Sequence, residues 1–372
     1  MIYNLKNQVF ITTTSSISSA SNDCEELFTN VCKGKTGVKN NTQYSHDSLP
    51  AIGKIQSSNT FYENLIMQCQ KILDNSTLDN FENTLLIIGS SVGGMSITED
   101  SYFQNSNYQD INTSKHNINS ISEVIKKEFN FYDDISFSTA CTSSANALGY
   151  AYEVLQKGIY ENALVIGVDS LCKTTVGGFL SLGVLSSKPC KPFDKNREGM
   201  NVSEAIACLL LETKSNEKAV EICGVGYSSD AYHMTQPHPE GSKTAMQNAL
   251  QCANIKFNKI DYINAHGTGT IANDEAEANS ICDIFPNNPY VSSTKSITGH
   301  TLGAAGAIEA IISCKVIQNQ IVPKNTFLEE IENEELNLSK DTIKTDINYV
   351  LSNSFAFGGN NCSLIFKKVV EK

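Results

Sequence analysis

A cysteine stands where a strand should give way to a helix, in the run Ser138-Thr139-Ala140-Cys141-Thr142-Ser143-Ser144-Ala145. Apolar and β-branched residues at 134–138 predict the strand, and a helical pattern continues through Leu155. A thiol at such a junction lies near unpaired backbone N–H groups and the positive end of the helix dipole. Both lower the pKa of a thiol from its usual value of about 8.5. These features make Cys141 a candidate nucleophile with small neighbours that let a substrate approach, although a cysteine taken alone is more often a small buried core residue.

Outward from this run, strand-like apolar segments alternate with small-residue helical segments. The segments expected to be strands are residues 9–11, 84–89, 134–138, 163–168, 207–211, 260–264, 290–292 and 348–351. Apolar strands that alternate with helices indicate mostly buried sheets between helical layers. The polar residues from about 96 to 120 show no clear period and predict a surface loop. The fold class is therefore α/β.

Two segments of the chain also resemble each other weakly. Ser138-Thr139-Ala140-Cys141 and its small-residue helix resemble Ser293-Thr294-Lys295-Ser296 and the Gly/Ala-rich residues 303–307. A strand-like segment follows each of them. We expect two related βαβ-type halves packed face to face, an N-terminal half over residues 1–212 and a C-terminal half over residues 213–372.

Composition excludes several classes of function. Hydrophobic content of 40% and charged content of 18% are typical of a globular protein, and the net charge of −12 does not favour binding to nucleic acid or an anionic membrane. No apolar run reaches the ~18 residues that span a bilayer, and the N-terminus lacks a signal-peptide pattern, so we expect a cytoplasmic protein. The 12 cysteines are irregularly spaced, without a Cys-x-x-Cys pair, and predict neither a metal site nor disulfides.

Two histidines lie in glycine-rich surroundings later in the chain. Asn264-Ala265-His266-Gly267-Thr268-Gly269-Thr270 follows a predicted strand, which is a common position for catalytic groups in α/β proteins. Lys295 and His300 precede the Gly/Ala-rich helix, and Glu309 lies within it. Charged groups in such apolar surroundings are costly to bury unless they are paired. Taken singly, each has an ordinary interpretation: a turn-satisfying histidine, a surface lysine and an exposed helical glutamate.

The last motif is Ser354-Phe355-Ala356-Phe357-Gly358-Gly359-Asn360-Asn361. Its glycine pair predicts a tight turn whose N–H groups could supply one donor of an oxyanion hole. The four motifs, in this order, resemble those of the β-ketoacyl-[acyl-carrier-protein] synthase family, of the Cys-His-His kind with the thiolase fold. Residues 86–94, 191–199 and 228–235 add further matches. The resemblance covers residues 84–372 well and residues 1–83 weakly.

The resemblance implies a thiolase-like fold with a layered α-β-α-β-α core and a condensing activity. Cys141 would attack an acyl-carrier thioester and hold the acyl group for a decarboxylative Claisen condensation with malonyl-acyl carrier protein. His266 and His300 would promote decarboxylation and stabilise the enolate. Lys295 would orient the two histidines, and Glu309 would balance its charge.

The same resemblance assigns roles around the nucleophile. The N–H groups of Cys141 and Phe357 would form the oxyanion hole, and Phe357 with Gly358 would form a gate between the acyl pocket and the malonyl site. Thr268 and Thr270 would bind the phosphopantetheine arm. No cofactor or metal is implied, because the substrates are carried on that arm.

The expected partner is an acyl carrier protein, with the chain acting as a homodimer or as a heterodimer with a ketosynthase-like chain-length factor. Such carriers are acidic, so Lys195 and Arg197 are candidates for a basic docking patch. They could equally be ordinary solvated charges.

Several features depart from the family pattern. Ala356 and Asn360 stand where the family usually has Gly and Thr, and the region before Cys141 is some tens of residues shorter. This favours a specialised synthase for polyketides or polyenes over a housekeeping elongation enzyme. Two alternatives stay open: a non-catalytic chain-length-factor-like partner, which usually lacks the cysteine, and a thiolase-fold acyltransferase, which pairs its nucleophile with Cys-His or His-Asn.

Overall fold

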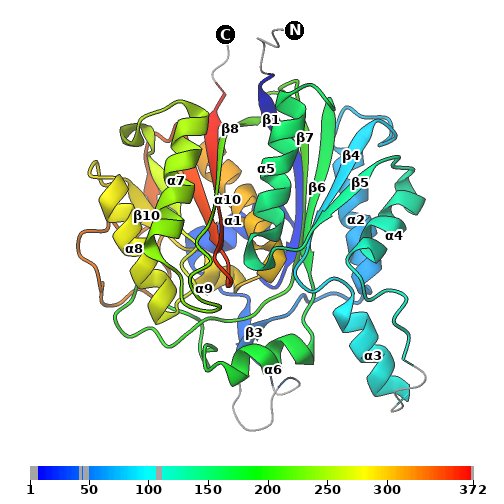
Figure 1. Ribbon diagram of the computed structural model, residues 1–372, viewed down its shortest axis with the longest axis horizontal. Helices are drawn as coiled ribbons and strands as arrows, with labels where there is room; N and C mark the ends of the chain where they lie inside the picture. The colour runs from blue at the N-terminus through cyan, green and yellow to red at the C-terminus, as the bar shows by residue number, and fades with distance from the viewer. Residues whose placement is uncertain (1–6, 42–43, 45–49, 106–110, 370–372) are drawn as a thin grey trace.

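The computed structural model describes residues 7–41, 44, 50–105 and 111–369 (Figure 1). The strands are β1 (Val9–Ser18), β2 (Val38–Asn40), β3 (Ala51–Gly53), β4 (Thr84–Gly89), β5 (Asp134–Phe137), β6 (Asn162–Asp169), β7 (Ala205–Glu212), β8 (Val220–Ser229), β9 (Tyr262–Asn264), β10 (Tyr290–Ser292), β11 (Ile321–Val322), β12 (Ile343–Lys344), β13 (Tyr349–Phe355) and β14 (Asn360–Lys368). The α-helices are α1 (Cys24–Lys33), α2 (Phe61–Asp74), α3 (Met95–Asn105), α4 (Asn119–Phe129), α5 (Ser143–Gln156), α6 (Lys173–Ser181), α7 (Pro239–Ala253), α8 (Ile271–Ile284), α9 (Lys295–Thr298) and α10 (Ala305–Asn319).

Ten strands form one mixed sheet in the order β10-β9-β13-β14-β8-β1-β7-β6-β4-β5. Its middle is a short junction, because β1 pairs with β8 only from Val9 to Ile11. From that junction outward, β1-β7-β6-β4-β5 and β8-β14-β13-β9-β10 repeat the same order of equivalent strands. In each half-sheet the three outer strands are parallel. The proposed division at residues 212 and 213 falls between β7 and β8 and stays a prediction.

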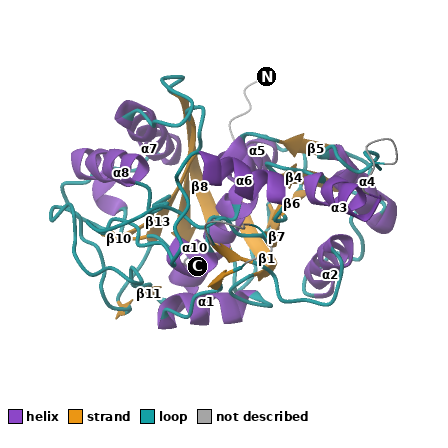
Figure 2. Cartoon of the chain, turned by 90° about the horizontal axis from the view of Figure 1, so that it is seen from below, coloured by secondary structure: helices purple, strands orange, loops and turns teal. Residues whose placement is uncertain are grey.

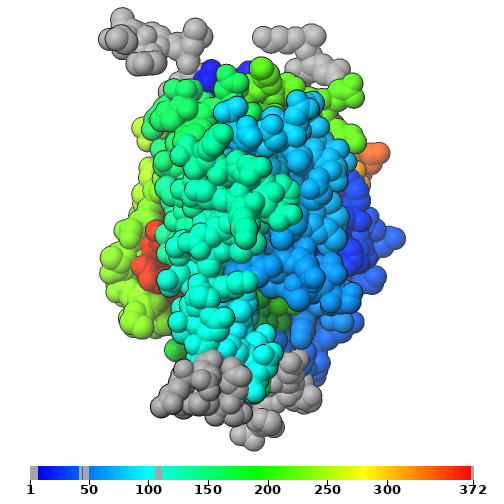
Figure 3. Space-filling view, turned by 90° about the vertical axis from the view of Figure 1, so that its right-hand side faces the viewer, coloured from blue at the N-terminus to red at the C-terminus, as the bar shows by residue number. Residues whose placement is uncertain are grey.

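Helices form three layers around the two half-sheets (Figure 2). α5 and α10 contact strands of both half-sheets and lie between them, which buries the largest apolar cluster. α2 and α4 cover the N-terminal half-sheet, and a second cluster fills the space beneath them. α7 and α8 bury a third cluster on the other half-sheet. The predicted α-β-α-β-α layering is confirmed, and Figure 3 shows the outer face built largely from the segment that contains α2 and α4.

The two central helices approach each other very closely because small residues face one another. A Cβ added at Gly306 of α10 would lie 2.7 Å from the Cβ of Ala145 in α5. A Cβ at Gly167 of β6 would lie 2.5 Å from Ala307. The Ala307 N–H donates to Ser144 Oγ at 2.9 Å, so a hydrogen bond also joins the two helices. Larger side chains at these positions would force the helices apart.

Every segment expected to be a strand overlaps a strand of the ten-stranded sheet, whereas β8 and β14 of that sheet and the short strands β2, β3, β11 and β12 were not predicted. The expected surface loop from residue 96 is wrong in its first part, because α3 occupies residues 95–105. Part of that stretch, residues 106–110, lies outside the described residues. Within the described part of the chain, no helix is long and apolar enough to cross a membrane.

Candidate active site

The carboxyl ends of the parallel strands in both half-sheets point to a common pocket. Cys141 follows β5, His266 follows β9, His300 follows β10 and Phe357 follows β13. All four side chains border one pocket. The full lining is Cys141, Phe179, Met200, His233, Thr235, Gln236, Pro237, His266, Thr268, Thr270, Asn273, His300, Phe355, Ala356, Phe357, Gly358 and Gly359. Residues far apart in sequence therefore meet where ligands commonly bind in α/β sheets.

Cys141 lies in a 3₁₀ turn, Ala140–Thr142, that leads directly into α5. Ala140 has a φ of 53°, an uncommon left-handed conformation that turns the chain sharply before the nucleophile. Cys141 is only 8% exposed, and the backbone N–H groups of Phe357 and of Cys141 itself act on its thiol in the direction that lowers its pKa. The predicted oxyanion donors thus lie next to the sulfur, and their role stays a prediction.

The expectation of a lowered thiol pKa is wrong for this structure. Burial raises the pKa of Cys141 to about 11, because the thiolate would lose its hydration. The positive charge of Lys295 and the N–H group of Phe357 act in the opposite direction but do not cancel the effect. The thiol therefore stays protonated at neutral pH until a substrate or a base takes its proton.

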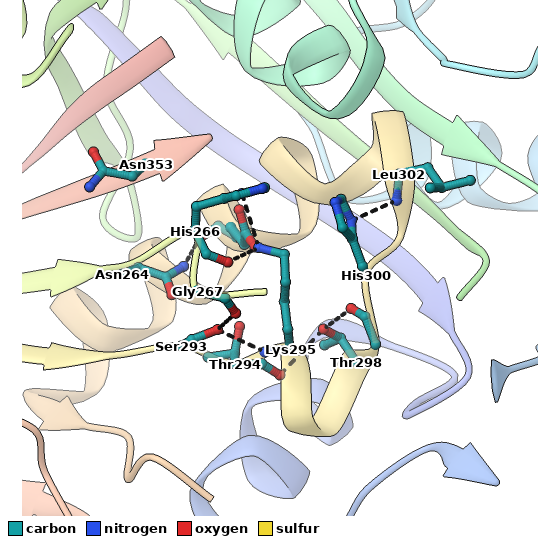
Figure 4. A network of polar contacts seen from close by, with 12 residues as sticks. Asn264, His266, Gly267, Ser293, Thr294, Lys295, Thr298, His300, Leu302 and Asn353 are labelled. Atoms are coloured by element: carbon teal, nitrogen blue, oxygen red, sulfur yellow. Dashed lines mark hydrogen bonds and ion pairs between the residues drawn. The ribbon is translucent and has the colours of Figure 1, made fainter. Parts of the chain in front are cut away.

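Lys295 is the centre of a buried polar network (Figure 4). Its ammonium group is 1% exposed, contacts Glu309 Oε1 and the carbonyl oxygen of His266, and lies 3.3 Å from His266 Nδ1. Burial raises the pKa of Glu309 to about 7, while the adjacent Lys295 lowers it. The predicted pairing of Lys295 with Glu309 is therefore present in the structure, next to the histidine that it was expected to orient.

The geometry sets the protonation of both histidines. Burial, reinforced by the charge of Lys295, holds the pKa values of His266 and His300 well below 6.5, so both rings are neutral at pH 7. His300 Nδ1 accepts the N–H of Leu302 at 3.2 Å, and Nδ1 of His266 faces the Lys295 ammonium. Each ring therefore carries its proton on Nε2. The ring centroids are 5.3 Å apart, so two N–H donors can converge on one ligand oxygen.

Comparison with known proteins shows which family the chain belongs to. The model of the N-terminal domain of β-ketoacyl synthases matches residues 57–217, and the model of the C-terminal domain matches residues 219–329. The chain belongs to the β-ketoacyl synthase family.

Relatives of this synthase match along almost its whole length. The 3-oxoacyl-[acyl-carrier-protein] synthase 2 of Coxiella burnetii is 32% identical over 426 aligned residues, which cover 98% of this chain and all of that protein. A chain from the complex of a ketosynthase with its chain length factor from Xenorhabdus doucetiae is 29% identical, with a TM-score of 0.88 and 98% of both chains covered. A β-ketoacyl synthase from Burkholderia phymatum is 26% identical, also with a TM-score of 0.88, over 98% of this chain and all of that one.

The pocket of the synthase also holds the residues expected to bind the substrate arm. Thr268 and Thr270 line it, and their hydroxyl oxygens are 2.8 Å apart. The ring of Phe357 lies beside Phe179 of α6, at 6.2 Å between centroids. Gly358 has a φ of 85°, and its N–H donates to the carbonyl of Met234 at 2.9 Å. The turn that carries Phe357 and Gly358 therefore borders both α6 and the loop before α7, and its role as a gate stays a prediction.

The predicted basic patch is contradicted at Arg197. Its guanidinium is buried and donates to the backbone carbonyls of Asp194 and Ile271 at 2.9 and 3.0 Å. It also forms ion pairs with Glu332 and, at 3.8 Å, with Asp274. A charge neutralised in this way holds the turn against α8 and cannot attract an acidic partner. Lys195 of the same turn is exposed, and its role stays a prediction.

Several buried acidic residues of the synthase were missed by the sequence interpretation. Glu277 of α8 accepts the N–H groups of His266 and Gly267 at 2.9 and 2.8 Å and thereby fixes the turn that carries the histidine. Asp169, at the end of β6, accepts from Ser91 and from Gly303 and connects the loops of the two halves. The only available signal was an acidic residue on the helix after the His266 motif, which usually indicates a solvated helix face.

The described residues contain no cluster of three or more His, Cys, Asp or Glu side chains that could hold a metal ion. The acidic groups near the pocket bind backbone N–H groups or Lys295 instead. The polar side chains that line the pocket include the Cys141 thiol, three imidazoles and the hydroxyls of Thr268 and Thr270, and the Lys295 ammonium lies 3.3 Å from His266 Nδ1.

Proposed function

We propose that the chain catalyses a decarboxylative Claisen condensation between an acyl group on Cys141 and malonyl-acyl carrier protein, giving β-ketoacyl-acyl carrier protein. One observation carries this proposal: a buried thiol with two N–H donors shares a pocket with two neutral imidazoles. The similarity to 3-oxoacyl-[acyl-carrier-protein] synthase 2 over the full chain supports it.

In the first half-reaction, Cys141 Sγ attacks the acyl thioester on the carrier. The S–C bond to Cys141 forms, the carrier thiol leaves, and the proton of Cys141 passes to that leaving sulfur. The carbonyl oxygen becomes an oxyanion in the tetrahedral intermediate, where the N–H groups of Cys141 and Phe357 stabilise it. A protonated resting thiol suits this step, because the leaving group needs the proton that the nucleophile loses.

In the second half-reaction, the malonyl thioester loses CO₂ and leaves an enolate. The negative charge develops on the thioester oxygen, where Nε2–H of His266 and of His300 can both donate. Neutral imidazoles act as donors here, so their low pKa values place them in the required state. The enolate carbon then attacks the acyl group on Cys141, the C–S bond to Cys141 breaks, and the departing thiolate takes up a proton from water. Thr268 and Thr270 hold the arm that presents the malonyl group.

The pathway and the assembly are finer proposals. The similarity to a ketosynthase solved with its chain length factor supports service in specialised polyketide or polyene synthesis and a dimer with a related chain. We also propose a cytoplasmic location and catalysis without a bound cofactor. An acyl carrier protein is the proposed substrate-bearing partner, with Lys195 as one contact for its acidic surface.

Intact-mass measurement after mixing the protein with acyl carriers of graded chain length tests the first half-reaction. An acyl adduct should form on the wild type and be absent from Cys141→Ala. Malonyl carrier added to the acylated protein should then discharge the adduct and give a β-ketoacyl carrier. An adduct that persists in Cys141→Ala would contradict the assigned nucleophile.

A second candidate is a non-catalytic partner that only shapes a heterodimer pocket, the role implied by a chain-length factor. The similarity to a chain from a complex of a ketosynthase with its chain length factor supports this second candidate. It predicts no adduct with any carrier, even when a ketosynthase is supplied. A third reading, a thiolase-fold acyltransferase, predicts an adduct that malonyl carrier does not discharge by condensation.

A further inference from the structure

The loop that carries Phe357 is a closed turn between β13 and β14. The N–H of Ala356 donates to the carbonyl of Asn360 at 2.9 Å, and Gly359 donates back to Ala356 at 3.1 Å. Gly359 has a φ of 79°, and a Cβ there would lie 2.0 Å from Asp230 Oδ1. The turn is therefore narrow, and any movement of its tip depends on what holds its base.

The β14 end of this turn is connected to the segment around Cys141 through the side chain of Asn360. Its Oδ1 lies 2.7 Å from Thr142 Oγ1 and 2.9 Å from Asn146 Nδ2. Thr142 directly follows Cys141, and Asn146 lies one helical turn further on in α5. The single hydroxyl proton of Thr142 can go either to Asn360 or to the carbonyl of Thr139, 2.7 Å away. The Asn146 amide can supply Asn360 in either case, so the two asparagines form the lasting connection.

This connection joins the turn that carries Phe357 to the turn that carries Cys141, and of its three residues Asn360 is partly exposed. Thr142 is fully buried and Asn146 is nearly so. The Asn146 amide also donates to Thr139 Oγ1 at 2.8 Å, so it holds both ends of the turn around Cys141. An amide that binds both segments fixes their separation more firmly than apolar packing would, because hydrogen bonds constrain distance and direction.

We propose that Asn360 and Asn146 are positioning residues that keep the N–H of Phe357 aligned with the reacting centre at Cys141. They act through the loop, since Phe357 supplies the donor and Cys141 supplies both the other donor and the sulfur. The inference rests on the proposed function for its catalytic meaning, because only an acyl transfer produces the oxyanion that Phe357 stabilises. The known departure of Asn360 from the family pattern thus becomes part of how this chain holds its gate.

The test compares two reactions of the same thiol. Acylation by a short-chain acyl-pantetheine thioester passes through an oxyanion, whereas alkylation by iodoacetamide does not. Both need an accessible Cys141 sulfur that loses its proton, so the ratio of the two rate constants reports on the oxyanion donors, which only acylation uses. In Asn360→Ala we expect this ratio to fall by about 10- to 100-fold, since loss of one such donor costs about 10²–10³ and displacement costs less.

A double-mutant cycle supplies the second measurement. Asn146→Ala should lower the ratio like Asn360→Ala, and the double variant should be little worse than either, because both remove one connection. Asn30→Ala is the matched control: the buried amide of Asn30, in α1, donates to the carbonyl of Ala20, which precedes that helix, and neither residue lines the pocket. It should leave the ratio unchanged even where it lowers stability.

An unchanged ratio in folded Asn360→Ala, or fully multiplicative effects in the double variant, would overturn the proposal. A fall of the same size in Asn30→Ala would overturn it too, because the effect would then be general destabilisation. If Asn360→Ala does not fold, Asn146→Ala alone still decides. A wild type that is alkylated but never acylated would instead refute the proposed function, so the two failures are distinguishable.

Discussion

The two half-sheets share one topology and put different chemistry at the same place. Each has a 3₁₀ turn before its central helix, and the first residues of these turns, Ala140 and Leu302, both have a φ of 53°. In the N-terminal half the next residue is Cys141. In the C-terminal half it is Gly303, whose Cβ, if present, would lie 2.5 Å from the backbone N of Ser91. One turn presents a nucleophile, and its counterpart is used for close packing.

The C-terminal half places its chemistry elsewhere on the same frame. His266 follows β9 and His300 lies just before the 3₁₀ turn, with Lys295 and Glu309 behind them. Under the proposed function, one half would therefore hold the acyl group, and the other would provide the N–H donors for the enolate. A repeated fold needs only one copy of each function, because the strand ends of both halves face a single pocket.

The largest expected effect would separate these two roles. Cys141→Ala should abolish both acylation and condensation, by about 10⁴-fold or more, because the described residues that line the pocket include no second thiol. His300→Ala should keep acylation of Cys141 and slow condensation by about 10²–10⁴-fold. Rates with free and pre-acylated protein, measured separately, check this. The division between the halves would be disproved if His300→Ala failed to become acylated while remaining folded.

A smaller effect would sharpen the role of Lys295 within the C-terminal half. Its positive charge lowers the pKa values of His266 and His300, so Lys295→Met should raise both. A histidine protonates as pH falls through its pKa, so the acid limb of the condensation rate should move to higher pH. The measurement is the pH–rate profile of pre-acylated protein. Lys315→Met, which removes a lysine paired with Glu25 outside the pocket, is the control. Identical profiles for all three proteins would refute the electrostatic argument.

The contact between the halves can be tested through two glycines. Gly306→Ala should lower the free energy of unfolding by about 1–3 kcal/mol, because the new methyl group would meet Ala145. Gly177→Ala in α6 meets nothing within 4 Å, so it should be neutral or stabilising by up to about 1 kcal/mol. Urea unfolding of both variants checks this. Equal effects would mean that the α5–α10 contact tolerates more space than the structure indicates.

The smallest effect concerns the turn between β6 and β7 that was expected to attract the carrier. Lys195→Glu should raise KM for the carrier a few-fold with kcat unchanged, since exposed charges contribute about 0–1 kcal/mol. Arg197→Gln should instead lower stability, because it leaves Asp274 and nearby carbonyls without their buried partner. Steady-state kinetics and thermal unfolding distinguish the two. An unchanged carrier KM in Lys195→Glu would remove that residue from the docking surface.

The sequence indicated the charged residues that lie in apolar segments. It did not indicate the functional charged residues whose sequence neighbours are polar. Lys295 and Glu309 stood out because charges are rare among Gly and Ala residues. Glu277 did not, because an acidic residue on a helix is usually solvated, and only the fold brings it under the N–H groups of His266 and Gly267. Arg197 was misjudged for the same reason: its sequence neighbours do not reveal that α8 and Glu332 enclose it.

The strands were predictable from their apolar runs, but the state of the nucleophile was not. Position at a helix N-terminus favours the thiolate, and that part of the argument needs only local sequence. The pKa of Cys141 is nevertheless raised to about 11, because burial by both halves outweighs the groups that lower the pKa. Desolvation depends on residues far away in the chain, so no local pattern could have provided it.

The close contact between α5 and α10 limits where the substrate preference of such a protein can change. Cys141 sits at the start of one helix, and Glu309, which supports Lys295, lies in the other, with Gly306 against Ala145 between them. Substitutions at this helix contact move the nucleophile and the N–H donors together, so they lower the rates of both half-reactions. New substrate preferences are therefore more accessible through the borders of the pocket, such as α6 and the turn at Phe357, which can vary while the central pair stays constant.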